Sequence, residues 1–382
     1  MTNQDTTTAA ADVAPGPDYA ARRDALAAAL PAAGCDVLVV THPVHVLWLT
    51  GFAGSNGAVL VDARGGAERA VISTDGRYTV QVAAQAPDLR CVDARDCGPA
   101  LIRDLLDREG DGATAPRIGF EAAHVTVSGS GALREAAGGD LVEVVDAVED
   151  LRRVKDDVEL DALRHAARIA VDAFAALVAD GCIRAGATER EVAAELEYRM
   201  RMRGADGPSF DTIVASGPNS AKPHHGAGDR VLEDGDLVTV DFGALAGGYC
   251  SDMTRTVVVG GVDAADDFSR EIYSIVLRSQ LAGIEAARPG TRLVDVDAAC
   301  RNVIVAAGYG EYFVHSTGHG IGADVHEAPY ASVKGEGVLE PGMTLTIEPG
   351  IYVPGRGGVR IEDTLVITDG EPENLVPLPK TL

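Results

Sequence analysis

The chain has 382 residues, 46% of them hydrophobic, and a formal net charge of −25. This length favours two domains that each bury a core. The acidity argues against nucleic acid as a partner, because displacing phosphate counterions requires a basic face and no Lys/Arg cluster is present.

The first 17 residues, MTNQDTTTAAADVAPGP, predict a disordered polar tail. They contain neither the basic region nor the apolar stretch of a signal peptide. No run of about eighteen apolar residues occurs in the sequence, so no membrane span is expected. Six scattered cysteines without a C-x-x-C pair favour free thiols in a reducing compartment. We therefore expect a cytoplasmic protein that binds no membrane.

Residues 18–150 alternate between helical and extended patterns. Helical spacing is found in ARRDALAAAL and in GPALIRDLLDREG, and strand patterns in CDVLVVT, AVLVDA, RIGFE and LVEVVD. The alternation predicts an N-terminal domain with a helix-covered mixed sheet, in an α/β (α+β) protein. No residues in this range have the spacing of a catalytic motif. Single histidines such as His45 and His165 are expected to be hydrogen-bonded core residues.

A charged passage over 146–158 leads into the second half, and we place the domain boundary at about residue 150. The following pattern predicts a long helix over 157–180 that ends at Gly181. Thr188 and Glu191 form a capping-box pattern for a second helix. Two further helices are expected over about 265–287 and 292–307, with the remaining strands of a domain over 151–382 between and after them.

Those strands contain a repeat that carries four acids. GDLVTVDFG (235–243) matches PGMTLTIEPG (341–350), and CSDMTRTVVV (250–259) matches RIEDTLVIT (360–368). Each half predicts a strand, a turn and a returning antiparallel strand, which places Asp241 opposite Asp252 and Glu348 opposite Glu362. Four carboxylates so close repel one another, and the repeat therefore indicates a bound cation.

A segment rich in histidine and glycine, HSTGHGIGADVHEAP (315–329), lies between the two hairpins. Its glycines make a helix improbable, so we expect a strand that passes into a bend where backbone approaches closely. His319 can then supply a nitrogen ligand while His315 and His326 line the cavity. Four carboxylates with one imidazole favour two Mn, Co or Fe ions over zinc. Two such ions can hold a bridging hydroxide for hydrolysis.

Taken in order, PHHG, VTVDFG, SDMTRT, HSTGHGIGADVHEAP, TIEPG and GGVRIEDT resemble the "pita-bread" metallopeptidases, in the branch of Xaa-Pro aminopeptidases and Xaa-Pro dipeptidases (prolidases). The resemblance is dense over residues 150–382, and LWLTGFAGSNGAVLVD with STDGRYTVQ more loosely resembles their N-terminal domain, of creatinase/prolidase type. It implies a pita-bread catalytic domain that holds two divalent ions, usually manganese or cobalt. The implied ligands are Asp241, Asp252, His319, Glu348 and Glu362.

The resemblance also implies the remaining site residues. Glu348 would exchange protons with the water, and His224, His315 and His326 would contact the substrate or the tetrahedral intermediate. Arg360 would line the site, in an ion pair that supports the ligands. This chain has His224 and His225 side by side where one histidine is usual, and the spacing to Asp241 selects His224.

The implied function is an Xaa-Pro aminopeptidase that acts on proline-containing peptides as a homodimer or higher homo-oligomer. One alternative is an Xaa-Pro dipeptidase, and a more remote one is a peptide-binding member of the fold without hydrolytic activity. A metal-free hydrolase of a creatine-like C–N bond lacks the ligand set found here. A general remover of N-terminal methionine normally lacks a substantial domain before residue 150.

Overall fold

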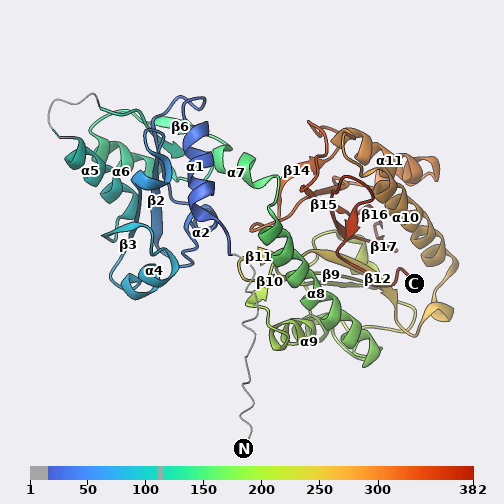
Figure 1. Ribbon diagram of the computed structural model, residues 1–382. Coiled ribbons are helices and arrows are strands. Elements are labelled where there is room, and N and C mark those ends of the chain that lie inside the picture. The colour runs from blue at the N-terminus through green and yellow to red at the C-terminus, as the bar shows by residue number, and fades with distance from the viewer. Residues whose placement is uncertain (1–15, 111–114) are drawn as a thin grey trace, which may run out of the picture.

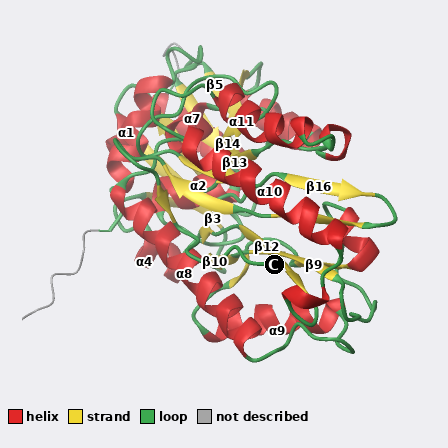
Figure 2. Ribbon diagram, turned by 90° about the vertical axis from the view of Figure 1, so that its right-hand side faces the viewer, coloured by secondary structure: helices red, strands yellow, loops and turns green. Residues whose placement is uncertain are grey.

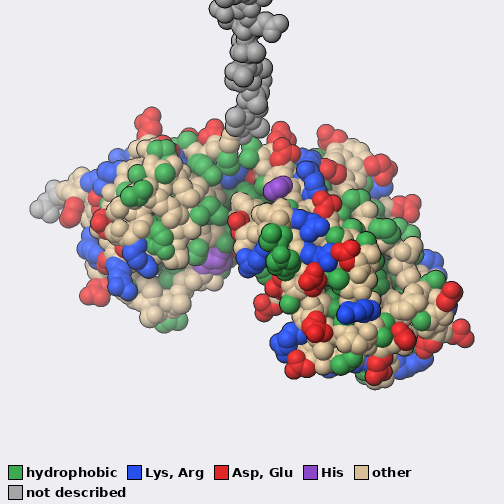
Figure 3. Space-filling view, turned by 90° about the horizontal axis from the view of Figure 1, so that it is seen from below, with side chains coloured by type: hydrophobic (Ala, Val, Ile, Leu, Met, Phe, Trp, Pro, Cys, Tyr) green, Lys and Arg blue, Asp and Glu red, His purple; other side chains and the backbone are tan. Residues whose placement is uncertain are grey.

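The computed structural model describes residues 16–110 and 115–382 and shows two lobes (Figure 1). The tail predicted over 1–17 lies almost wholly outside these residues. On the face shown in Figure 3, acidic and basic side chains are interspersed and form no large basic patch. In the described part of the chain, no helix combines the length and apolar character needed to cross a membrane.

The N-terminal lobe is built on one mixed sheet with the strand order β4-β3-β2-β1-β5-β6. Strands β1, β2 and β3 pair antiparallel, whereas the pairs β3–β4, β1–β5 and β5–β6 are parallel. The strand bounds are β1 (Val37–Val40), β2 (Gly57–Asp62), β3 (Ala70–Thr74), β4 (Arg90–Asp93), β5 (Ile118–Glu121) and β6 (Val142–Val144).

Helices cover both faces of this sheet, as the alternating sequence patterns predict. In β1 all four side chains are buried, with Leu38 and Val40 in one core and Val37 and Val39 in the other. This follows from the alternation of side chains along a strand that lies between two helical layers. The helix bounds are α1 (Tyr19–Ala29), α2 (Pro43–Thr50), α3 (Gly66–Arg69), α4 (Thr79–Gln85), α5 (Cys97–Glu109), α6 (Val127–Ala137) and α7 (Ala147–Arg152).

The C-terminal lobe consists of short strands with helices outside them. Figure 2 shows strands β9 and β12 between helix α10 and helix α9. The helices are α8 (Asp157–Ala179), α9 (Glu189–Met202), α10 (Asp267–Ala286) and α11 (Leu293–Ala306). The strands are β7 (Gly207–Pro208), β8 (Ile213–Ser216), β9 (Leu237–Phe242), β10 (Ala244–Ala246), β11 (Tyr249–Cys250), β12 (Met253–Val258), β13 (Gly318–Gly320), β14 (Glu327–Ala331), β15 (Thr344–Ile347), β16 (Gly350–Val353), β17 (Gly357–Arg360), β18 (Asp363–Val366) and β19 (Glu373–Asn374).

The helix starts in this lobe follow the sequence closely. Thr188 caps α9, and its hydroxyl and the Glu191 side chain form both hydrogen bonds of the predicted capping box. Asp156 and Glu159 form the same arrangement at α8. Each box satisfies amide groups that the first helical turn leaves without partners. The capped helices pack on a core that includes residues of β9 and β12.

Both predicted hairpins are present, and their registers differ. Strand β15 pairs with β18 so that Ile347 lies opposite Asp363, and the next step along the ladder brings Glu348 beside Glu362. Strand β9 pairs with β12 so that Asp241 lies opposite Thr254. The expectation that Asp241 directly faces Asp252 is therefore wrong by two residues. A shift of two keeps the side chain on the same face, so Asp252 still points to the same side as Thr254.

The glycines of the histidine segment allow a close approach of backbone, as predicted. A Cβ atom added at Gly318 would lie 1.7 Å from the carbonyl oxygen of Thr346. Strand β13 pairs with β14, and its register shifts between His319 and Gly320. The segment is thus a short strand with an irregularity beside a histidine that is 6% exposed.

The two lobes are joined by buried polar contacts. The Trp48 indole packs in the N-terminal core and donates to Glu159 Oε1 at 2.8 Å. Arg152 of α7 and Lys155 both pair with Glu327 of β14 at 2.5 Å. By contrast, His165 is exposed on α8, so the expectation that it lies in the core is wrong.

Candidate metal centre

A pocket of about 840 Å³ lies in the C-terminal lobe, at the point where the two hairpins meet the histidine segment. It brings together side chains from strands that are far apart in the sequence. The residues predicted as ligands or as contacts of the substrate all line it, namely His224, Asp241, Asp252, His315, His319, His326, Glu348, Arg360 and Glu362.

Three of the expected ligands form a tight group. Asp252, His319 and Glu362 each offer one ligand atom, and these atoms lie within 4.8 Å of one another. His319 Nε2 lies 3.3 Å from Glu348 Oε1 and 3.6 Å from Asp252 Oδ2. Three of the predicted acids therefore converge on the edge of the His319 ring.

The orientation of this ring is fixed by the backbone. His319 Nδ1 lies 2.9 Å from the carbonyl oxygen of Gly320. A carbonyl can only accept, so Nδ1 carries the proton and Nε2 presents its lone pair to the acids. Burial lowers the pKa of His319 to about 4, which keeps the ring neutral at physiological pH. A neutral imidazole is the form that binds a metal ion.

The carboxylates lack the partners that buried acids normally have. Asp241 Oδ1 and Glu362 Oε1 are buried and accept no hydrogen bond in the described part of the chain. Burial first, and then Glu362 and Asp241, raise the pKa of Asp252 well above its usual range. Burial raises the pKa of Glu348 to about 8, and burial with Glu348 and Asp241 raises that of Glu362. A cation would relieve both the repulsion and the unpartnered oxygens.

Arg360 balances part of this negative charge. Its Nη2 donates to Asp241 Oδ2 at 2.5 Å, its Nε to Thr254 Oγ1 at 3.1 Å, and its Nη1 to the Tyr352 hydroxyl at 2.8 Å. Burial alone would lower the pKa of Arg360, but Tyr352, Asp241 and Glu348 hold it well above its usual range. The guanidinium therefore stays charged and fixes the position of Asp241.

The histidines around the pocket have different surroundings. His315 donates from Nδ1 to the Ser316 carbonyl at 2.7 Å, and its Nε2 lies 2.8 Å from the Tyr352 hydroxyl. Burial lowers the pKa of His315 to about 4. His326 is exposed and its ring centroid lies 4.4 Å from that of His319. Both histidines thus flank the converging acids.

The two adjacent histidines differ in their contacts. His225 Nε2 lies 2.7 Å from Glu189 Oε2, so its ring is held by helix α9. His224 has an exposed side chain and lines the pocket. Both residues line the pocket, and His224 is the more exposed of the two.

Sequence reasoning missed two buried residues that hold the site together. The Thr254 hydroxyl donates to Glu362 Oε2 at 2.7 Å, and the Tyr352 hydroxyl joins Arg360 to His315. Thr254 had a usable signal, because it follows Asp252 by two positions and so shares its face of the strand. Tyr352 lies on β16, outside every recognised motif.

Comparison with known proteins supplies the family. Residues 161–369 match metallopeptidase family M24, and residues 22–154 match the creatinase/prolidase N-terminal domain. The first match covers more than half of the chain. The chain belongs to metallopeptidase family M24. This confirms the predicted architecture, and membership of a metallopeptidase family implies divalent metal ions and peptidase activity.

Three relatives place the protein within family M24. A protein of Pyrococcus furiosus named Xaa-Pro dipeptidase is 47% identical over 240 residues, which are 63% of this chain and 68% of that one. The structure of an Xaa-Pro dipeptidase from Bacillus anthracis has a TM-score of 0.88 and 41% identity, and covers 96% of this chain and 99% of that one. The X-Pro aminopeptidase from Thermotoga maritima has a TM-score of 0.81 and 35% identity, and covers 94% and 98%.

Two of these three relatives are named dipeptidases. The resemblance to the branch that acts on Xaa-Pro bonds is thereby confirmed. Within that branch, the similar proteins favour the dipeptidase alternative over the aminopeptidase that the sequence analysis predicts.

Proposed function

We propose that this M24 peptidase is an Xaa-Pro dipeptidase, which hydrolyses the bond before proline in dipeptides. One observation carries the proposal: among residues 16–110 and 115–382, no group donates a hydrogen bond to the buried oxygens Asp241 Oδ1 and Glu362 Oε1, and the Nε2 of His319 presents its lone pair to the same group of acids. The names of the relatives from Pyrococcus furiosus and Bacillus anthracis support the choice of substrate.

The donor set fits a pair of hard divalent cations. Four carboxylates and one imidazole would hold them, and manganese is our proposed metal, with cobalt or iron as the alternatives and zinc less suited. When bound, such ions would polarise a carbonyl group and lower the pKa of water to a value near neutrality. The residues that would hold the ions are Asp241, Asp252, His319, Glu348 and Glu362.

We assign proton transfer to Glu348. The bond before proline is a tertiary amide, so its nitrogen carries no hydrogen and must receive a proton before it leaves. Burial raises the pKa of Glu348 to about 8, which shows that its surroundings favour the protonated carboxyl. A carboxylate that takes a proton from the attacking water can then return it to the proline nitrogen.

The histidines and Arg360 position the reacting groups. His224 and His326 have exposed rings at the pocket, where they can donate hydrogen bonds to the carbonyl oxygen as negative charge develops on it. His315 is held by Tyr352, and Tyr352 in turn accepts from Arg360. Arg360 also holds Asp241. It acts as a positioning residue that couples the substrate side of the pocket to the ligand side.

A series of Ala-Pro, Ala-Pro-Ala and Ala-Pro-Ala-Ala tests the substrate. We expect cleavage of the dipeptide and little or no cleavage of the longer peptides. Efficient cleavage of the tripeptide and tetrapeptide would replace the dipeptidase with an aminopeptidase. Failure to cleave any of them with manganese or cobalt present would overturn the proposal.

An Xaa-Pro aminopeptidase is the second candidate. It is favoured by the volume of the pocket, about 840 Å³, which lies near the upper end of the range for pockets that enclose drug-sized ligands and leaves room beyond a dipeptide. The similarity to the Thermotoga maritima enzyme supports the same choice. The peptide series above separates the two candidates directly.

We further propose a domain boundary near residue 150, a homo-oligomer and a cytoplasmic location. The match to the N-terminal domain ends at residue 154 and the match to family M24 begins at residue 161, which supports the boundary.

The cysteines support the proposed location. All six are free, as expected in a reducing compartment. The homo-oligomer remains a prediction that light scattering of the purified protein tests.

A further inference from the structure

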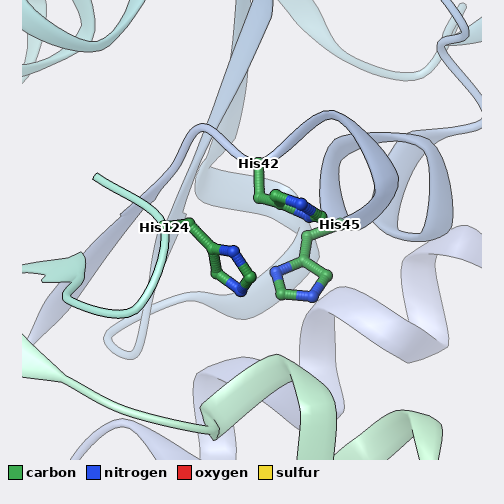
Figure 4. Close-up of side chains that lie close together, drawn as sticks. All are labelled: His42, His45 and His124. Atoms are coloured by element: carbon green, nitrogen blue, oxygen red, sulfur yellow. The ribbon is translucent and has the colours of Figure 1, made fainter. Parts of the chain in front are cut away.

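Three histidines meet in the N-terminal lobe, away from the pocket. His42 precedes α2, His45 lies within it, and His124 follows β5 (Figure 4). Each offers a ring nitrogen, and these nitrogens lie within 4.8 Å of one another. The centroid of the His42 ring lies 4.7 Å from that of His45 and 4.0 Å from that of His124.

We propose that His42, His45 and His124, together with Glu149, form a separate zinc site. It differs from the candidate catalytic centre in its ligands, since imidazoles dominate here and carboxylates dominate there. Zinc prefers nitrogen ligands in a tetrahedral arrangement, and three histidines with one carboxylate complete such a set.

One histidine is held in the orientation that metal binding requires. Glu121 Oε1 accepts from His45 Nδ1 at 2.5 Å, and Glu121 Oε2 accepts from the backbone N–H groups of Thr41 and His42 at 2.6 and 2.9 Å. A carboxylate that fixes one ring nitrogen leaves the other nitrogen, here His45 Nε2, with its lone pair free. The same carboxylate–histidine pairing supports many zinc ligands.

Two ring nitrogens of the cluster are buried and accept or donate no hydrogen bond within the described residues. His45 is 0% exposed, and its Nε2 has no hydrogen-bond partner among the described residues. The same is true of His42 Nδ1. A buried nitrogen without a partner is unfavourable, and a metal bond would offset that cost.

Glu149 supplies the fourth ligand. Its Oε1 lies 2.7 Å from His124 Nε2 and 3.9 Å from His45 Nε2. Nitrogens bound at about 2.1 Å to a tetrahedral zinc lie about 3.4 Å apart, so modest rotations of the side chains would close the site. His124 is exposed, which leaves its ring room to rotate.

The position of the cluster suggests what the ion would do. Glu149 lies on α7, and Arg152 of the same short helix pairs with Glu327, the residue after His326. A metal ion bound by Glu149 would therefore tie the N-terminal sheet to the helix that contacts the catalytic lobe. We expect it to raise the thermal stability of the protein.

Metal analysis of the manganese-loaded enzyme tests the site. Wild-type protein, the variant His124→Ala and the control His165→Ala are each equilibrated with zinc, dialysed, and analysed for total metal per chain by mass spectrometry. We expect His124→Ala to retain one ion fewer than the other two proteins. We also expect zinc to raise the melting temperature of His124→Ala less than it raises that of the wild-type protein and of His165→Ala. Equal metal content in all three proteins would overturn the proposal.

A second measurement does not depend on a variant that folds. Crystals of the wild-type enzyme grown with zinc are measured on both sides of the zinc absorption edge. An anomalous peak between His42, His45 and His124 supports the site. Its absence, with zinc found only at the catalytic pocket or nowhere, overturns the proposal and leaves the proposed peptidase activity untouched.

Discussion

Two buried glutamates in the catalytic lobe differ in what neutralises them. Glu189 is 0% exposed, and its oxygens accept from Ser216, Asn219 and His225 side chains at 2.7–2.9 Å. The backbone N–H groups of Ser216 and Gly228 also donate to it. Burial alone would raise the pKa of Glu189, but these hydrogen bonds outweigh it and lower the pKa to about 2.

Glu362 is equally buried at 1% exposure, but only one of its oxygens is satisfied, by the Thr254 hydroxyl. Its other oxygen has no donor within the part of the chain that the structure describes, and its pKa is raised by burial, Glu348 and Asp241. Glu189 is thus a structural anion, complete within the protein. Glu362, by contrast, needs a cation to satisfy its second oxygen. This difference distinguishes a metal centre from a buried acid with a structural role.

The largest expected effect on activity comes from removing one of the predicted metal ligands. Asp252→Ala or His319→Ala should reduce Xaa-Pro hydrolysis below detection and lower the bound manganese, because the remaining groups cannot hold both ions. Circular dichroism should show an intact fold. The control Asp161→Ala removes an exposed acid from α8 and should leave activity and metal content unchanged. Normal turnover by His319→Ala would contradict the assignment.

Glu348→Gln tests proton transfer with little change in shape. We expect kcat to fall by about 10²–10⁴-fold, the usual contribution of a general acid–base, with a smaller change in KM. Steady-state kinetics on Ala-Pro at saturating manganese measures both constants. A variant that retains wild-type kcat would exclude Glu348 from proton transfer.

Thr254→Val removes a hydroxyl that donates to Glu362 and accepts from Arg360. Loss of such a supporting hydrogen bond typically costs 10–100-fold in metal affinity or activity, and we expect a loss of that size. Thr239→Val is a matched control, because the Thr239 hydroxyl bonds to the Thr256 hydroxyl at 3.0 Å and not to a predicted ligand. Equal effects of the two substitutions would indicate general destabilisation of the sheet.

The smallest expected effect is on the pH dependence of folding stability, and it comes from Glu189. The folded-state pKa of Glu189 is below the ordinary value of 4.5, so its ionisation stabilises the fold above about pH 4.5, and this contribution is lost as the pH falls toward 2. Glu189→Gln should cost about 1–3 kcal/mol of unfolding free energy at pH 7 and reduce the loss of stability between pH 4.5 and 2. Urea unfolding at a series of pH values measures this. An unchanged pH dependence would contradict the role given to its hydrogen bonds.

Local patterns in the sequence predicted much of this molecule. The capping box at Thr188 and the repeated acidic strands depend on residues that are near one another in the chain. The register of β9 on β12 could not be derived, because it is set by the connection between the strands and by Ser251, which bonds the backbone of Ala244. A strand pattern alone is compatible with shifts of two residues.

Contacts between distant segments were the least accessible to sequence. Tyr352 meets His315 across 37 positions, and His42 meets His124 across more than 80. No local periodicity in the sequence predicts such contacts, because they depend on how the strands and helices pack together. His45 was expected to be an ordinary core histidine, and burial agrees with that, but its two neighbouring rings change the interpretation.

The most direct test of the metal centre is anomalous diffraction from crystals of the manganese-loaded enzyme, measured on the same preparation as hydrolysis of Ala-Pro. The account predicts two manganese peaks bounded by Asp241, Asp252, His319, Glu348 and Glu362, in a protein whose activity disappears with chelator and returns with manganese. An active protein without peaks at these five residues would contradict it.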